Sequence, residues 1–226
     1  MNELLTAVST AGPLAAGWSI HGLLLRRRLT AARRDPLSGL WTRDAFEARA
    51  ARTLARRPQV AVLLLDLDGF KAVNDRHGHA AGDAAIRTTA AALTTALSGR
   101  GGAVAARLGG DEFAAVVPLS DPAGLPWLLA GLHDEITAPF RYGGHNLRVG
   151  VSIGAALSSD LNAASRTPGD GVLGRLLRLA DEAMYAVKRD GGGWHYPAAG
   201  APVTGTTAGR RTGRPGTHTT LRKGAA

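Results

Sequence analysis

Apolar residues along the chain fall into short blocks whose spacing predicts alternating strands and helices. Residues 60–65 form an unbroken apolar run, which is typical of a strand buried on both faces. Strand-like runs on either side of two glycine pairs predict hairpins over 103–118 and 141–156. Apolar residues at helical spacing predict four helices, over 43–57, 82–97, 122–137 and 173–188. Thr42 has the residue type and position of an N-cap for the first helix.

The order of these elements is strand, helix, hairpin, helix, hairpin, helix. This order predicts an α/β (α+β) fold in which helices cover a sheet of mixed direction, in the general class of the split βαβ arrangement. Residues 35–196 would form this domain. Residues 197–226 consist mainly of Gly, Thr, Pro, Ala and Arg and cannot bury a core, so a disordered basic tail is predicted there.

Residues 4–25 are the longest stretch without Asp, Glu, Lys or Arg near the start of the chain. As a helix they would span a bilayer core of roughly 30 Å. Three arginines follow at 26–28, and the positive-inside rule then places the rest of the chain in the cytoplasm. We therefore expect 1–34 to be a single-pass anchor in the inner membrane. Pro13 and three glycines lower its hydrophobicity. The alternative is a helix that docks on a partner subunit, with the protein wholly cytoplasmic.

The formal net charge of +9 is concentrated at the two ends of the chain. Residues 1–34 carry +4 and residues 197–226 carry +5, which leaves 35–196 neutral. A nucleic-acid-binding domain carries its positive charge on the folded surface, so this distribution argues against a nucleic-acid partner. The chain has no cysteine, which excludes disulfides and cysteine-ligated metals.

Two acidic segments are candidates for chemistry. Asp111 and Glu112 follow a glycine pair at a predicted hairpin turn, where adjacent carboxylates repel each other unless a cation lies nearby. Asp66 and Asp68 end the buried strand, with Lys71 shortly after, a combination that suits a divalent cation and phosphate. Each segment alone is also compatible with solvated acids at an ordinary turn or strand end. If the two converge in space, they would share one divalent ion.

The segment 109–113, Gly-Gly-Asp-Glu-Phe, resembles the signature of the GGDEF domain family, the diguanylate cyclases. Other segments resemble further motifs of this family in order and spacing. They are residues 35–40, 66–71, 74–75, 78–79, 82–83, 151–154 and 181–188. Together they cover about 35–192.

The resemblance implies a fold like the palm of nucleotidyl cyclases and polymerases. It implies condensation of two GTP molecules into cyclic di-GMP with release of two pyrophosphates. By resemblance, Asp66, the Leu67 carbonyl and Asp111 are ligands of a catalytic Mg²⁺ or Mn²⁺, and Glu112 assists them. Asp111 is also the base that accepts the proton of the 3′-hydroxyl. Lys71 has a catalytic role as a phosphate contact.

The remaining substrate contacts also come from the resemblance. The implied contacts are Lys188 to phosphate, Gly109 and Gly110 against the triphosphate, Asn74 and Asp83 to guanine, and His79 beside them. Three of these have structural alternatives. Lys188 could be a solvated lysine at a helix end, His79 a capping residue, and Asp83 the N-cap of a helix over 84–97. Asp68 receives no role.

Two positions depart from the family pattern. The inhibitory product site of the family, Arg-x-x-Asp, is degenerate, because Arg100 is present and Ala103 replaces the aspartate. An alanine methyl cannot replace a carboxylate that bonds a guanine edge, so weak product inhibition is expected. Gly192 stands where the family commonly has arginine, so a phosphate contact is missing and activity is expected to be low.

One such domain can hold only one GTP, so the resemblance implies a homodimer. The 34 residues before the domain are too few for a sensory domain, and we expect the helix within them to pair two chains. The alternative function is a GGDEF domain that binds GTP without turning it over and acts as a sensor or scaffold.

Overall fold

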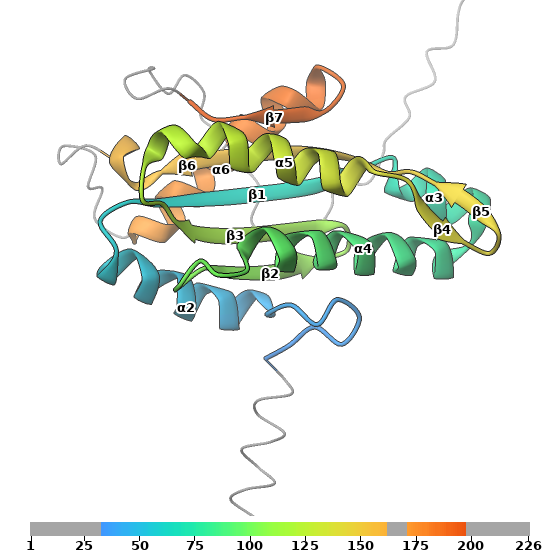
Figure 1. The fold of residues 1–226 in the computed structure, drawn as a ribbon, viewed down its shortest axis with the longest axis horizontal. Helices are drawn as coiled ribbons and strands as arrows, with labels where there is room; N and C mark the ends of the chain where they lie inside the picture. The colour runs from blue at the N-terminus through green and yellow to red at the C-terminus, as the bar shows by residue number, and fades with distance from the viewer. Residues whose placement is uncertain (1–32, 162–170, 198–226) are drawn as a thin grey trace, which may run out of the picture.

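The computed structural model describes residues 33–161 and 171–197, so the expectations for 1–32 and 198–226 lie outside it. Its main sheet has five strands in the order β2-β3-β1-β6-β7, and β4 and β5 form a separate ribbon (Figure 1). The strands are β1 (Val60–Asp68), β2 (Val104–Gly109), β3 (Glu112–Pro118), β4 (Phe140–Tyr142), β5 (His145–Leu147), β6 (Gly150–Leu157) and β7 (Gly193–His195). The helices are α2 (Arg43–Arg56), α3 (Phe70–His77), α4 (His79–Leu97), α5 (Leu125–Thr137) and α6 (Val172–Arg189), with short 3₁₀ turns at Pro122–Gly124 and Ser158–Asp160.

The sheet is of mixed direction, which confirms the predicted fold class. The central strand β1 is antiparallel to both β3 and β6, whereas β6 and β7 are parallel. The register places Asp66 opposite Glu112 on β3 and opposite Ser152 on β6. The end of β1 therefore lies between the hairpin tip and the start of β6.

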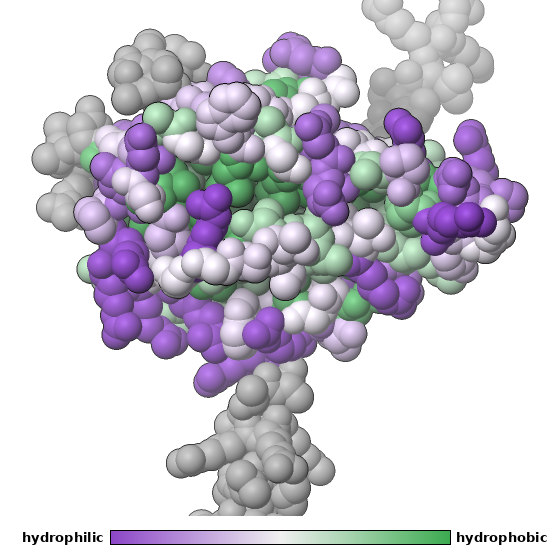
Figure 2. All heavy atoms as spheres, in the orientation of Figure 1, coloured by the Kyte–Doolittle hydropathy of each residue, from purple (hydrophilic) through white to green (hydrophobic). Residues whose placement is uncertain are grey.

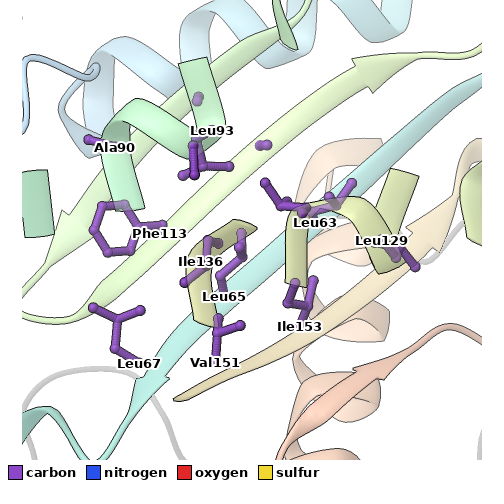
Figure 3. Close-up of a cluster of buried hydrophobic side chains, with 14 of the residues drawn as sticks. Leu63, Leu65, Leu67, Ala90, Leu93, Phe113, Leu129, Ile136, Val151 and Ile153 are labelled. Carbon is purple, nitrogen blue, oxygen red and sulfur yellow. The ribbon is translucent and has the colours of Figure 1, made fainter. Parts of the chain in front are cut away.

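Helices cover both faces of this sheet. One hydrophobic cluster joins the sheet to α4 and α5, and the other joins it to α2 and α6. Leu63, Leu65 and Leu67 of β1 point into the first cluster, as Figure 3 shows. Since strand residues alternate between faces, Asp66 and Asp68 point to the opposite side, where α6 lies.

Helix α6 packs on β6 with no side chain between them at Gly154. A Cβ placed on Gly154 would lie 1.9 Å from the carbonyl oxygen of Ala180 and 2.3 Å from the amide nitrogen of Met184. Glycine is therefore required for the helix to reach this distance from the strand.

Several predicted boundaries are wrong, each for a local reason. Residues of α3 were not predicted to be helical, because the helix is only eight residues long and none of its side chains is fully buried. Helix α4 begins at His79 rather than 82, after Gly78 with φ +83°. The predicted hairpin over 141–156 is two elements, since only β4 and β5 form the ribbon, and β6 joins the main sheet. Strand β7 was missed because it is three residues long.

Two further expectations concern helix ends and membrane spans. Thr42 does occupy the N-cap position of α2, but its side chain makes no capping hydrogen bond. Within residues 33–161 and 171–197, no helix has the length and apolar character to span a bilayer. The segment 4–25 lies outside these ranges.

Candidate functional site

The end of β1 and the tip of the β2–β3 hairpin meet in one cleft. The amide of Leu67 donates a hydrogen bond to the carbonyl oxygen of Asp111, 3.2 Å away. A cavity of about 370 Å³ opens beside this contact, within the usual size range of ligand pockets. It is lined by Asp66, Leu67, Asp68, Gly69, Phe70, Lys71, Asp111, Lys188 and Gly191. The two acidic segments predicted to converge therefore do so.

Lys188 enters this cleft from the last turn of α6. Its ammonium donates a hydrogen bond to Oδ1 of Asp66, whose side chain is only 15% exposed. This contact follows from the strand alternation that turns Asp66 towards α6. Lys188 is thus not merely a solvated helix-end lysine, although it does lie at the end of α6.

The second lysine of the cleft is held more loosely. Lys71 pairs with Asp75 one helical turn further along α3, and both side chains are mostly exposed. An exposed pair of this kind contributes little to stability. Lys71 can therefore leave Asp75 and bind an anionic ligand with little loss of free energy.

Asp68, which has no role in the family resemblance described above, lines the cleft and is held in place by a neighbouring strand. The hydroxyl of the fully buried Ser152 donates to its carboxylate, with Oγ 3.0 and 2.9 Å from the two oxygens. Gly150 and Gly192 close around it, and a Cβ on Gly192 would lie 2.9 Å from Oδ2 of Asp68. Gly192 also has φ +100°, which favours glycine. An arginine cannot replace Gly192 here unless Asp68 moves.

A second group of predicted residues lies on α3 and α4, outside the residues that line this cleft. The side chain of Asn74 packs directly over Gly82, where an added Cβ would lie only 2.1 Å from Oδ1 of Asn74. Asp83 follows Gly82 within α4 and pairs with Arg87 at 3.8 Å. Asp83 is therefore not the N-cap of a helix over 84–97, because Gly78 holds the N-cap position. His79 is the exposed first residue of α4 rather than its cap.

Arg107 fixes the hairpin tip, and the sequence analysis assigned it no function. Its Nε donates to the carbonyl oxygen of Gly110 at 2.9 Å, and its Nη1 donates to both carboxylate oxygens of Asp35, at 3.2 and 3.3 Å. One signal could have identified it, namely a charged residue inside an otherwise apolar strand. Through Arg107 the segment before α2 holds the turn that carries Asp111.

A second cavity, of about 430 Å³, lies on the other side of this turn. It is lined by Asp35, Thr42, Arg43, Asp44, Arg107, Leu108, Gly109 and Gly110. Glu112 faces the same side, with an oxygen 4.0 Å from Arg43. Gly109, Gly110 and Glu112 are thus not among the residues that line the cleft of Asp66 and Asp111. The paired acids and lysines distinguish that first cleft as the candidate catalytic site.

Low pH should weaken the ion pair between Asp35 and Arg107. Burial alone would raise the pKa of Asp35, but hydrogen bonds from Ser38 and Arg107 and the charge of Arg107 lower it below its ordinary value of 3.8. The ionised carboxylate therefore stabilises the fold above this value, and the contribution is lost as the pH falls through the lowered pKa. We predict that Asp35→Asn lowers the free energy of unfolding by about 1 kcal/mol at neutral pH.

Urea unfolding at about pH 7 and about pH 3 measures this effect. The difference between the parent protein and Asp35→Asn should shrink in acid. The exposed Asp190→Asn serves as the control and should change little at either pH. An undiminished difference in acid would contradict the assignment of the effect to this ion pair.

The donor set of the cleft fits a hard divalent cation. Among the described residues, no group of three or more His, Asp or Glu side chains is placed to hold a metal by itself. The cleft instead offers the carboxylates of Asp66 and Asp111. Mg²⁺ is commonly bound by one or two carboxylates, with waters and substrate phosphates completing the shell. The residues present therefore suit a metal that binds together with a phosphate ligand.

With this geometry established, comparison with known proteins identifies the class. Residues 32–193 match the family described as "Diguanylate cyclase, GGDEF domain". The chain belongs to the GGDEF domain family.

Relatives and solved structures agree with this assignment. The chain is 45% identical over 172 residues to a Streptomyces ambofaciens protein named "Uncharacterized 19.3 kDa protein in repSA 5′ region", covering 76% of this chain and 87% of that protein. It is 38% identical over 168 residues to diguanylate cyclase TpbB of Pseudomonas aeruginosa, covering 72% of this chain but only 36% of TpbB. The coiled coil and GGDEF domain of DgcB from Caulobacter crescentus, solved in complex with c-di-GMP, superposes with a TM-score of 0.67 at 26% identity, covering 84% of this chain and 99% of that one.

Proposed function

We propose that this protein is a diguanylate cyclase, which condenses two GTP molecules into cyclic di-GMP and two pyrophosphates. The observation that carries the proposal is the meeting of Asp66 and Asp111 in one cleft with Lys71 and Lys188. Membership of the GGDEF family and the relatives named diguanylate cyclase support it.

In this proposal Asp111 accepts the proton of the 3′-hydroxyl of one GTP. The 3′-oxygen of that GTP then attacks the α-phosphorus of the facing GTP. The bond between the α- and β-phosphates breaks, and pyrophosphate leaves. Lys71 and Lys188 contact the phosphates and offset the charge that develops on the leaving group. The step occurs twice, so that two phosphodiester bonds close the ring.

The metal site would be formed by Asp66, Asp111 and the Leu67 carbonyl, with Glu112 assisting. The side chain of Leu67 is buried in the core, so only its backbone is available for such a role. A bound Mg²⁺ or Mn²⁺ would supply Lewis-acid polarisation of the phosphate and neutralise triphosphate charge. Gly109 and Gly110 would let the backbone lie against the triphosphate.

The guanine base is assigned to Asn74 and Asp83, with His79 beside them. An amide and a carboxylate can accept from N1–H and N2–H₂ of guanine and donate to O6. Their placement around Gly82 supports this assignment.

Gly82→Ala should lower the affinity for GTP without lowering the stability of the fold. The added methyl would overlap Oδ1 of Asn74, so the amide must move, and we expect the affinity for GTP to fall about tenfold, as for loss of one polar contact. Alanine is the better helix former by about 0.5–1 kcal/mol, so the melting temperature should be kept or rise. Calorimetric titration with GTP and thermal melting measure the two effects. Unchanged GTP affinity would contradict the assignment of Asn74.

The described residues of each chain form one such cleft, so the reaction requires a homodimer that brings two clefts face to face. We propose that residues 1–34 provide the pairing, and that residues 4–25 also anchor the chain in the inner membrane with residues 35–196 in the cytoplasm. On this division, residues 197–226 form a separate basic tail. A cell-fractionation experiment with and without residues 4–25 tests the membrane location.

Removal of residues 1–34 should lower specific activity and make it depend steeply on protein concentration. The reason is that two half-sites must then meet by diffusion alone. Activity per chain, measured over a dilution series down to nanomolar protein, checks this expectation. A specific activity that stays equal to that of the full chain on dilution would show that pairing lies elsewhere.

Feedback by product should be weak through the site that contains Arg100 and Ala103. Nε of Arg100, which follows α4, donates to the carbonyl oxygen of Ala96 in the last turn of that helix, and Ala103 offers no carboxylate. Calorimetry with cyclic di-GMP on a chain with Asp66→Asn and Asp111→Asn tests this, since binding below micromolar concentration would contradict it.

The function itself is tested by incubating the purified protein with GTP and Mg²⁺ and separating the nucleotides by chromatography. Cyclic di-GMP should accumulate with the parent protein and not with Asp111→Ala. Binding of GTP without product in both would instead support a GTP-binding scaffold.

A further inference from the structure

The described surface has one strongly basic region, formed by the segment before α2 and by α2 itself. Residues 33–57 contain seven arginines and three acids. The other described residues, from 58 onwards, contain eleven basic and thirteen acidic side chains. Figure 2 shows hydrophilic side chains along the lower edge of the molecule, where α2 runs in Figure 1.

Four of these arginines are close neighbours. The guanidinium groups of Arg34 and Arg49 each lie 3.5 Å from the centre of the Trp41 ring. Burial, and then the charge of Arg49, lower the pKa of Arg34. Burial, and then the charges of Arg52 and Arg33, lower the pKa of Arg49. Like charges are thus held together, and Trp41 fixes the two that stack on it.

No carboxylate of the described residues forms an ion pair with Arg33, Arg34, Arg49 or Arg52. Along α2, Arg49, Arg52 and Arg56 recur at a spacing of three and four residues, which places them on one side of the helix. A row of arginines without acidic partners suits an extended anionic surface better than a single small anion.

The position of these arginines along the chain indicates which anionic surface they contact. Only residues 26–32 separate the apolar stretch 4–25 from Arg33, and seven residues span at most roughly 25 Å. If 4–25 lies in a bilayer, α2 must lie near the lipid headgroups. Arginines close to an anionic leaflet each contribute to attraction towards it.

We propose that an arginine face, formed by Arg34 before α2 and by Arg49, Arg52 and Arg56 on α2, docks on the anionic phospholipid headgroups of the membrane. The face then orients the domain, with α2 towards the lipid and α4 and α5, on the other side of the sheet, away from it. This proposal concerns orientation and does not depend on the proposed cyclase activity.

The experiment uses the full chain and exploits its lack of cysteine. A donor fluorophore is attached to Ala48→Cys on the exposed surface of α2 or, as the control, to Gly131→Cys on the exposed surface of α5. Vesicles of phosphatidylcholine, alone or mixed in equal parts with phosphatidylglycerol, carry an acceptor-labelled lipid. Energy transfer from position 48 should be several-fold higher in the anionic vesicles than in the neutral ones, where only the apolar stretch holds the chain at the bilayer. In the anionic vesicles it should also exceed the transfer from position 131. High salt should reduce this difference.

Charge removal then tests the residues. Each arginine near the surface changes partitioning about fivefold, so Arg52→Gln with Arg56→Gln should weaken docking roughly 25-fold. The matched control removes the same charge at Arg141 on β4 and at Arg148, which directly follows β5, and should leave transfer unchanged. Circular dichroism checks that all variants fold.

Three results would overturn the proposal. They are equal transfer from positions 48 and 131, equal transfer with neutral and anionic vesicles, and no effect of the Arg52 and Arg56 substitutions. Binding of duplex DNA to the same face in preference to the anionic vesicles would assign the face to nucleic acid and would also overturn it.

Discussion

Replacing Asp66 or Asp111 with asparagine is expected to lower the rate of cyclic di-GMP formation at least about a thousand-fold. Each substitution removes a charged oxygen donor from the cleft in which the metal and triphosphate are proposed to bind. Residues that act as one unit have non-additive effects, so the double variant should be scarcely worse than either single one. Product formation from GTP with Mg²⁺, quantified by chromatography, measures all three rates.

Asp75→Asn is the matched control, because Asp75 pairs with Lys71 but does not line the cleft. We expect its rate to remain within about tenfold of the parent rate. Thermal melting should show all variants folded, since Lys188 is 43% exposed and remains hydrated when Asp66 loses its charge. Activity retained by Asp66→Asn and Asp111→Asn would exclude the proposed metal site.

Gly154→Ala is expected to destabilise the fold by more than about 3 kcal/mol, at the upper end of the range for overpacking. The added Cβ would overlap backbone atoms of Ala180 and Met184, which cannot rotate away as a side chain can. Helix α6 would have to move away from β6 and would carry Lys188 with it. Urea unfolding of the purified variant, or its loss from the soluble fraction, measures the effect.

Gly131→Ala provides the opposite case for the same substitution. A Cβ on Gly131 meets nothing within 4 Å, and the residue lies inside α5. The variant should gain about 0.5–1 kcal/mol from helix propensity. Equal effects at 131 and 154 would contradict the close approach of α6 to β6.

The sequence predicted the elements with strong apolar patterns and the site residues that flank them. The run over 60–65 is the buried centre of β1, and the acids at its end do meet Asp111 of the hairpin tip in one cleft. This was predictable because a central strand is apolar on both faces, so that polar residues at its end stand out.

The parts that sequence reasoning missed depend on contacts between distant segments. Helix α3 buries no side chain and β7 has three residues, so neither leaves a periodic pattern. The bond from Ser152 to Asp68 joins residues 84 positions apart, and the bonds from Arg107 to Asp35 join residues 72 apart. Such pairs follow from the strand order and register, which the spacing of apolar residues along the chain does not specify.

Strand β1 has a hydrogen-bonded neighbour on each side, whereas β2 and β7 form the two edges of the sheet. Fraying of the β7 edge would therefore leave β1 and its acids paired on both sides, whereas opening of the β2 edge would release the turn that Arg107 holds. On heating, catalytic competence should consequently survive opening at β7 and disappear when β2 separates from β3.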